Sequence, residues 1–366
     1  MIKTEFEQKQ SIIEDFMEAR HIDALLLKRA SSFAWATCGS SSYINTASSY
    51  GEAALLITSK GRYLITNNIE AKRLVNEELL DKQGWTPKVS MWHKTDSSIS
   101  DLTKGLRVGA DCDFQGSIDL SAEIARMRVN LLPIEQDRFR TLGKVCARAM
   151  ENAIHAVRPG MSEFEISGLL ALESEKLGAQ AIVNLIATDE RIFNYRHPLP
   201  TSKKMERYAM LVLCGRWKGL VASITRLVHF GWLTDELQKK MEVVAYIDAT
   251  FLTGTRPKRT LKEVFMDAVA AYTRRGFTGE WELHHQGGPA GYEPREYIAT
   301  PESEDVVFSG QTYAWNPSIT GTKSEDTILV TDDGFEVLTE IDDWPMLMVE
   351  LPDGKIVKRP AILEIK

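Results

Sequence analysis

The sequence lacks three features that would narrow its class directly: paired cysteines, a long apolar run and an excess of basic residues. Its 4 cysteines are scattered without a CxxC spacing, which predicts free thiols in a reducing compartment. No stretch approaches the about 18 apolar residues of a membrane span, and the N-terminal residues contain no apolar signal region. With 44 Lys and Arg against 51 Asp and Glu, the chain offers no basic surface for phosphates. We therefore expect a cytoplasmic protein that binds neither nucleic acid nor a membrane.

One stretch concentrates residues capable of chemistry. It runs from Trp281 to Glu296 and reads W-E-L-H-H-Q-G-G-P-A-G-Y-E-P-R-E, with two adjacent histidines and three glycines. Glycine and proline destabilise a helix interior, by about 1 and 3 kcal/mol per residue, and glycine lets the backbone approach a ligand closely. The stretch therefore predicts the floor of a site rather than a plain helix. A surface loop with inert histidines is the alternative that composition leaves open.

Hydrophobic patterns divide the chain into two domains. Short apolar runs alternating with helical patterns in the first part predict an α/β layer. Pro133 and a shift in composition place the boundary near residues 131 to 137, so we predict domains at 1–134 and 135–366. For the second domain the patterns predict strands and helices at 136–157, 162–177, 182–187, 208–214, 219–227, 235–252, 261–276, 312–315 and 326–331.

Several motifs of the second domain occur in a recognisable order. They are R-P-G-M-S-E, R-H-P-L-P, G-L-V-A-S-I-T-R, H-H-Q-G-G, A-W-N-P and S-E-D-T-I-L-V-T-D-D-G-F-E-V-L-T. This series resembles the pita-bread superfamily of creatinase, prolidase, aminopeptidase P and methionine aminopeptidase. The resemblance implies an α+β fold, with a curved antiparallel sheet in the C-terminal domain after a smaller α/β domain of the creatinase type. It also implies a homodimer.

The resemblance also indicates where metal ligands would lie. Metallopeptidases of this superfamily hold two divalent metal ions with two Asp, one His and two Glu, and these ligands fall here on Val212, Ser223, His285, Asn316 and Glu325. The three lost ligands are all carboxylates. Since divalent ions need several donors with balancing negative charge, we expect no metal and no other cofactor. A single ion held by His285 and Glu325, with Asn316, stays an open alternative.

The remaining polar residues suggest proton-transfer chemistry. His197, in R-H-P-L-P, stands where the superfamily keeps a histidine facing the substrate, and creatinase hydrolyses a C–N bond without metal by using a histidine and glutamates. A neutral imidazole can move a proton near pH 7. We therefore assign His197, His285 and Glu325 as catalytic. His284 is expected only to pack or to hydrogen-bond to backbone.

Six further residues form the predicted substrate-binding set. They are Ser223, Arg226, Tyr292, Glu293, Arg295 and Asn316. Tyr292 stands in place of a second histidine of the superfamily, which argues against a proline-peptide substrate. Arg226 has an open alternative role in a structural salt bridge.

The leading hypothesis is a metal-independent hydrolase that cleaves a C–N bond of a small nitrogenous compound. One alternative is a metal-dependent Xaa-Pro aminopeptidase or prolidase. The other is a catalytically silent binding protein on the same fold. The expected partners are a small-molecule or short-peptide substrate and a second copy of the chain.

Overall fold

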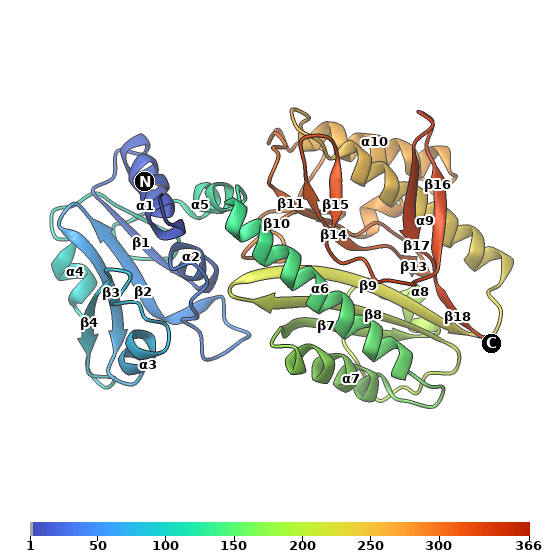
Figure 1. Cartoon of the computed structure of the whole chain (residues 1–366), viewed down its shortest axis with the longest axis horizontal. Helices are drawn as coiled ribbons and strands as arrows, with labels where there is room; N and C mark the ends of the chain where they lie inside the picture. The colour runs from blue at the N-terminus through green and yellow to red at the C-terminus, as the bar shows by residue number, and fades with distance from the viewer. Residues whose placement is uncertain (1–2) are drawn as a thin grey trace. The chain divides into compact units, whose positions relative to one another are not determined.

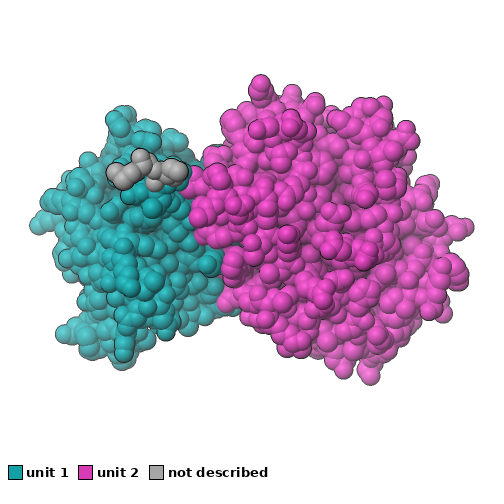
Figure 2. Space-filling model, viewed as in Figure 1, with its two compact units in different colours: residues 1–128, 218–220 teal, residues 129–217, 221–366 magenta. Residues whose placement is uncertain are grey.

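The computed structural model describes residues 3–366 and divides into two compact units. Unit 1 comprises residues 1–128 with 218–220, and unit 2 comprises 129–217 with 221–366 (Figure 2). Sequence patterns put the domain boundary near residue 134. The long helix α6 (Pro133–Ala156) begins there, with a proline in its first turn, where the missing N–H costs no hydrogen bond.

Unit 1 is built on a mixed six-stranded sheet of order β4-β3-β2-β1-β5-β6. Strand β1 (Ala24–Arg29) pairs antiparallel with β2 and parallel with β5, and its first four residues are buried. A run buried on both faces is typical of a central strand. The remaining elements are α1 (Glu5–Ala19), α2 (Ala30–Ala36), β2 (Tyr50–Thr58), β3 (Gly61–Asn67), α3 (Ala71–Asn76), β4 (Thr86–Ser90), α4 (Ser98–Leu102), β5 (Val108–Ala110), β6 (Ile118–Asp119) and α5 (Ser121–Arg128).

Unit 2 begins with two packed helices and a sheet of order β18-β9-β8-β7. Helix α7 begins after Ser162, whose hydroxyl accepts from the backbone N–H of Glu165, while the Glu165 side chain accepts from the backbone N–H of Ser162 to complete a capping box. Figure 1 shows α6 and α7 lying along this sheet. The elements are α7 (Glu163–Lys176), β7 (Gln180–Thr188), α8 (Glu190–Asn194), β8 (Tyr208–Trp217), β9 (Leu220–Phe230) and β18 (Leu363–Ile365).

The second sheet of unit 2 has the order β10-β11-β14-β15 and packs with helices α9 and α10 around a large apolar core. Phe251 of α9 and Trp315 of β11 stack in this core, with ring centroids 4.4 Å apart. Strands β12 and β13 form a separate two-stranded sheet, as do β16 and β17. The elements of this part of unit 2 are α9 (Asp235–Gly254), α10 (Leu261–Arg274), the 3-10 helix η1 (Glu280–Leu283), β10 (Gly287–Ala290), β11 (Thr312–Trp315), β12 (Ser318–Ile319), β13 (Thr322–Lys323), β14 (Asp326–Val330), β15 (Phe335–Val337), β16 (Met346–Glu350) and β17 (Ile356–Pro360).

The observed elements follow the sequence patterns closely where periodicity is strong. The glycine-rich stretch forms η1, a short loop and β10, and not a plain helix, as predicted. Strands β16 and β17 have no counterpart in the predicted elements. Met348 and Ile356 are exposed apolar residues within them, which obscures the alternation that marks a strand. Among the described residues, no helix combines the length and apolarity needed to cross a membrane.

Candidate active site

The two four-stranded sheets of unit 2 meet at Glu325, which directly precedes β14. An isolated bridge joins Glu325 to Thr225 of β9, and the backbone N–H of Thr225 donates to the Glu325 carbonyl over 3.2 Å. On the other side of β11, the backbone N–H of Asn316 donates to the carbonyl of Gln286 over 3.0 Å. The backbone thus fixes where Glu325, Asn316 and the histidine pair before Gln286 are placed.

Three histidines converge beside this junction. One ring nitrogen from each of His197, His284 and His285 lies within 4.8 Å of those of the other two. Nε2 of His284 is 3.0 Å from Nε2 of His197, which is a hydrogen bond when one ring nitrogen carries the proton. We call these three residues the histidine cluster. The expected role of His284, packing or bonding to backbone, misses this side-chain contact.

A buried amide holds the loop that carries two members of the cluster. The side-chain amide of Gln286 donates to the carbonyls of His284 and Trp281, over 2.7 Å and 3.0 Å. Its oxygen accepts from the hydroxyl of Tyr272 over 2.9 Å. These three bonds tie the loop to η1 and to α10. The position of His284 and His285 is therefore set by a satisfied polar network.

Burial and nearby cations keep the cluster neutral. Burial lowers the pKa of His284 to about 2, and the ammonium of Lys323 acts in the same direction. Burial and the guanidinium of Arg295 lower the pKa of His285 to about 4. The pKa of His197 is lowered by burial and by Lys323. A neutral imidazole can bind a metal ion, so all three rings are available for that role near pH 7. The low pKa of His284 and His285 makes both of them weak proton acceptors at that pH.

Glu325 is held as a carboxylate by two cations. Its oxygens lie 2.7 Å from Nζ of Lys323 and 2.9 Å from Nη2 of Arg295, and they also accept from the hydroxyl of Thr225. Burial would raise the pKa of Glu325, but Lys323, Arg295 and these hydrogen bonds outweigh it and lower the pKa to about 2. The carboxylate also raises the pKa of each cluster histidine. Sequence reasoning missed Lys323, which stands two residues before Glu325.

The positions of the superfamily's metal ligands do not fit a dinuclear centre. Val212 is buried in an apolar cluster and has no donor atom. Ser223 is buried, and its Oγ accepts from Nη1 of Arg295 over 3.0 Å. Asn316 is buried, and its Oδ1 finds no hydrogen-bond partner among residues 3–366. Arg295 contacts both Ser223 and Glu325. Its guanidinium therefore lies between two positions that bind metal ions in the superfamily.

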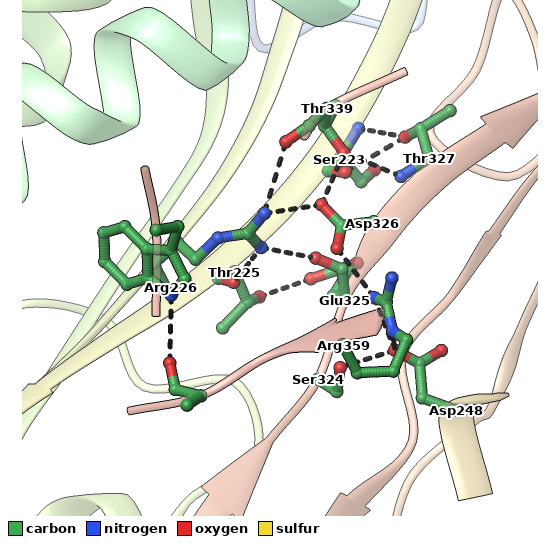
Figure 3. Close-up of polar contacts among 12 residues, drawn as sticks. Ser223, Thr225, Arg226, Asp248, Ser324, Glu325, Asp326, Thr327, Thr339 and Arg359 are labelled. Carbon is green, nitrogen blue, oxygen red and sulfur yellow. Dashed lines mark hydrogen bonds and ion pairs between the residues drawn. The ribbon is translucent and has the colours of Figure 1, made fainter. Parts of the chain in front are cut away.

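Arg226, predicted to bind substrate, belongs to a buried ion-pair network in the structure (Figure 3). Its Nη2 lies 2.8 Å from Asp326, whose other oxygen lies 2.7 Å from Arg359. Arg359 in turn pairs with Asp248 of α9 over 2.6 Å. The network therefore links β9, β14, β17 and α9. This is the structural salt bridge that the sequence left open for Arg226.

Two other predicted substrate-binding residues differ in exposure. Tyr292 is buried, and its hydroxyl donates to Oε1 of Glu135 over 2.6 Å. Glu293 is partly exposed on the turn after β10, where its carbonyl accepts from the N–H of Gly291. Tyr292 is thus engaged by α6 and does not face the histidine cluster through its hydroxyl.

Comparisons with known proteins place the chain in a family. The model of metallopeptidase family M24 matches residues 137–332. An Xaa-Pro dipeptidase of Lactobacillus helveticus is 24% identical over 235 residues, covering 61% of this chain and 63% of that protein. An uncharacterized peptidase of Staphylococcus aureus is 23% identical over 249 residues, covering 64% and 69%.

Solved structures show the same fold over nearly the whole chain. A prolidase from Pyrococcus horikoshii aligns with a TM-score of 0.78 at 21% identity, covering 92% of this chain and 99% of that chain. An Xaa-Pro dipeptidase from Bacillus anthracis aligns with a TM-score of 0.79 at 20% identity, covering 98% and 100%. The predicted pita-bread fold with its N-terminal domain is confirmed.

These matches correct one expectation. The prediction that the chain uses no cofactor is contradicted, because the matched family consists of metallopeptidases. The predicted hydrolase class is confirmed. Since the family model covers more than half of the sequence, the chain belongs to metallopeptidase family M24 and is a peptidase-type hydrolase with the pita-bread fold.

Proposed function

We propose that the chain hydrolyses the amide bond of a short peptide, and that Xaa-Pro dipeptides are the first substrates to test. The observation that supports this most strongly is the convergence of three neutral imidazoles beside an ionised glutamate. The names of two relatives, Xaa-Pro dipeptidase and prolidase, support the substrate class.

The proposed chemistry follows from the protonation states. Hydrolysis adds the hydroxyl of water to the carbonyl carbon, and the other proton of water goes to the leaving nitrogen as the C–N bond breaks. His197 has the most exposed ring of the cluster, so it is the imidazole that can accept and return the proton, and its contact with Nε2 of His284 orients it. Glu325 stays anionic above pH about 2 and raises the proton affinity of the imidazoles. Arg295 and Asn316 keep their proposed role in substrate binding.

The test is turnover of a substrate panel by the purified full chain. The panel contains Xaa-Pro dipeptides, dipeptides without proline and creatine, and the release of a free amino acid or of urea is measured. The protein is assayed as purified and after incubation with zinc, cobalt or manganese salts. Release from dipeptides is expected, and no turnover of any substrate by folded protein would contradict the proposal and favour a silent binding protein.

Single substitutions tie turnover to the site. Replacing His197 by alanine removes the proton-transfer group, which typically contributes about 10²–10⁴-fold to the rate, and replacing His285 removes the neighbouring imidazole of the cluster. We expect a loss of that size in kcat/KM for both variants. His93→Ala is the matched control, because His93 is an exposed histidine of unit 1, and it should leave the rate unchanged. Equal kcat/KM values for all three variants would show that the histidine cluster does not carry the turnover, and this would contradict the proposed site.

A further inference from the structure

The chain belongs to a metallopeptidase family, yet most of the residues at the superfamily's metal-ligand positions cannot bind a metal ion. The histidine cluster offers other ligands nearby. Two of the five usual ligands remain, and Glu325 already pairs with Lys323 and Arg295. A carboxylate neutralised by two cations has little charge left for a metal ion. A metal bound by this chain therefore needs donors elsewhere in the site.

We propose that the chain binds a single divalent transition-metal ion through His197, His284 and His285. The inference rests on the proposed function for the role of the ion. An imidazole nitrogen that holds the ion cannot also carry the proton, so the metal-bound form would use a water on the ion where the metal-free chain would use His197. Binding itself is measured without substrate. The stretch H-H-Q-G-G resembles the superfamily pattern G-H-G-x-G, in which the position of His284 is a glycine, so this ligand set differs from the one that the resemblance implies. Three imidazoles leave a coordination position open for water or substrate, as in catalytic zinc sites.

The geometry of the cluster suits such an ion. Two imidazole ligands at about 2.0–2.1 Å from a tetrahedral ion have nitrogens about 3.3 Å apart. Nε2 of His284 and Nε2 of His197 are 3.0 Å apart, and the third ring nitrogen lies within 4.8 Å. Small side-chain rotations would bring all three to a common ion. The ring centroids, 4.5 to 5.5 Å apart, leave the imidazoles facing one region.

Unused polar atoms are a second, independent observation. His284 is 7% exposed, and its Nδ1 has no hydrogen-bond partner among residues 3–366. The same is true of the buried Nδ1 of His285. A buried polar atom without a partner costs about 1–3 kcal/mol, so contacts within the described chain do not explain why two such rings are kept together. An ion held by Nε2 of His284 leaves Nδ1 of that ring as it is, whereas an ion bound through Nδ1 of His285 would satisfy the unpartnered atom of His285.

The surrounding charges select the kind of ion and the number bound. Ligand sets made of imidazole suit zinc, cobalt and nickel better than magnesium, calcium or manganese, which prefer oxygen. Lys323 and Arg295 repel a dication, so we expect weaker binding than at a closed structural zinc site. The same two cations oppose a second ion beside Glu325.

Zinc and cobalt binding to the full chain tests the proposal without substrate. After treatment with a chelator, the protein is titrated with zinc sulfate in a calorimeter, and cobalt is followed by its visible absorption. We expect a single saturable site and the strong visible bands of tetrahedral cobalt. Two tightly bound ions per chain, or weak binding with no defined stoichiometry, would overturn the proposal.

Matched variants locate the site. His284→Ala and His284→Gln should each weaken zinc binding by about 100-fold or more, beyond the loss seen when only a partner of a ligand is removed. His93→Ala should bind zinc as the wild type does. The glutamine variant preserves much of the side-chain volume, so it keeps the test valid if the alanine variant misfolds. Wild-type affinity in a folded His284 variant would contradict the assignment, whatever the outcome of the peptide assays.

Discussion

Glu325 illustrates how single residues change the character of an inherited site. In the superfamily this position binds metal, whereas here the carboxylate contacts Lys323, Arg295 and Thr225. Breaking a buried ion pair from one side leaves uncompensated charge, which typically costs about 3–5 kcal/mol. Part of the function of Glu325 is therefore to stabilise the folded unit.

Glu325→Gln should lower the free energy of unfolding at pH 7 by about 3–5 kcal/mol. The pKa of Glu325 is lowered to about 2 in the folded chain, so its contribution is complete above the ordinary glutamate pKa of 4.5 and is lost as pH falls toward 2. The difference between variant and wild type should therefore shrink in acid. Urea unfolding at several pH values measures it, with the exposed Glu302→Gln as control. A difference independent of pH would contradict the ion-pair explanation.

Sequence reasoning identified part of this site at the residue scale. His197, His285 and Glu325 were found because motif order fixes their positions. His284 was underrated because its partner His197 is 87 residues away in sequence, and no local pattern reports a contact of that range. Lys323 was missed although it stands two residues before Glu325, because nothing in the sequence shows that both side chains point to the same buried place. The catalytic and substrate-binding assignments stay predictions until variants are measured.

At the scale of elements, β10 and β11 determine where the histidine loop ends. Gly287 opens β10 with a positive φ of 108° and pairs with Trp315. A Cβ at Gly287 would overlap the carbonyl oxygen of Ala314, and it would also approach Oδ1 of Asn316 at 3.0 Å. The close approach of two backbones requires glycine at this position.

Gly287→Ala should destabilise the chain by roughly 2–4 kcal/mol, because strain in φ and overlap with backbone add together. Gly276→Ala is the matched control, since its φ is 84° but nothing lies within 4 Å of the added Cβ. It should cost about 1–2 kcal/mol from φ alone. Thermal unfolding of both variants gives the comparison. Equal losses would show that the close approach at β10 is unimportant.

The elements around the site were also the easiest to predict from sequence. Helices α9 and α10 and strands β8, β9, β11 and β14 follow strong apolar periodicity. Arg226 shows the limit of that approach. Its position on β9 was predictable, but its pairing with Asp326, 100 residues later, depends on how β9 and β14 meet.

At the scale of the whole molecule, the fold is conserved while the composition of the site has changed. The chain aligns with the structures of a prolidase and an Xaa-Pro dipeptidase over more than nine-tenths of its length, yet its identity to each is near one-fifth. Val212, Ser223 and Asn316 remove the carboxylates, and His284 adds an imidazole. The buried ion pairs from Arg226 to Asp248 connect β9, β14, β17 and α9 next to this altered site. A homodimer stays a prediction from resemblance.

Anomalous diffraction at the zinc edge from crystals grown with zinc tests the central claim most directly. The claim is that the histidine cluster forms the reactive centre of this peptidase-type hydrolase, in place of a carboxylate-bridged metal pair. The account predicts a single strong peak in contact with His197, His284 and His285. Two peaks beside Glu325 and Asn316, with Lys323 and Arg295 displaced from the carboxylate, would contradict it.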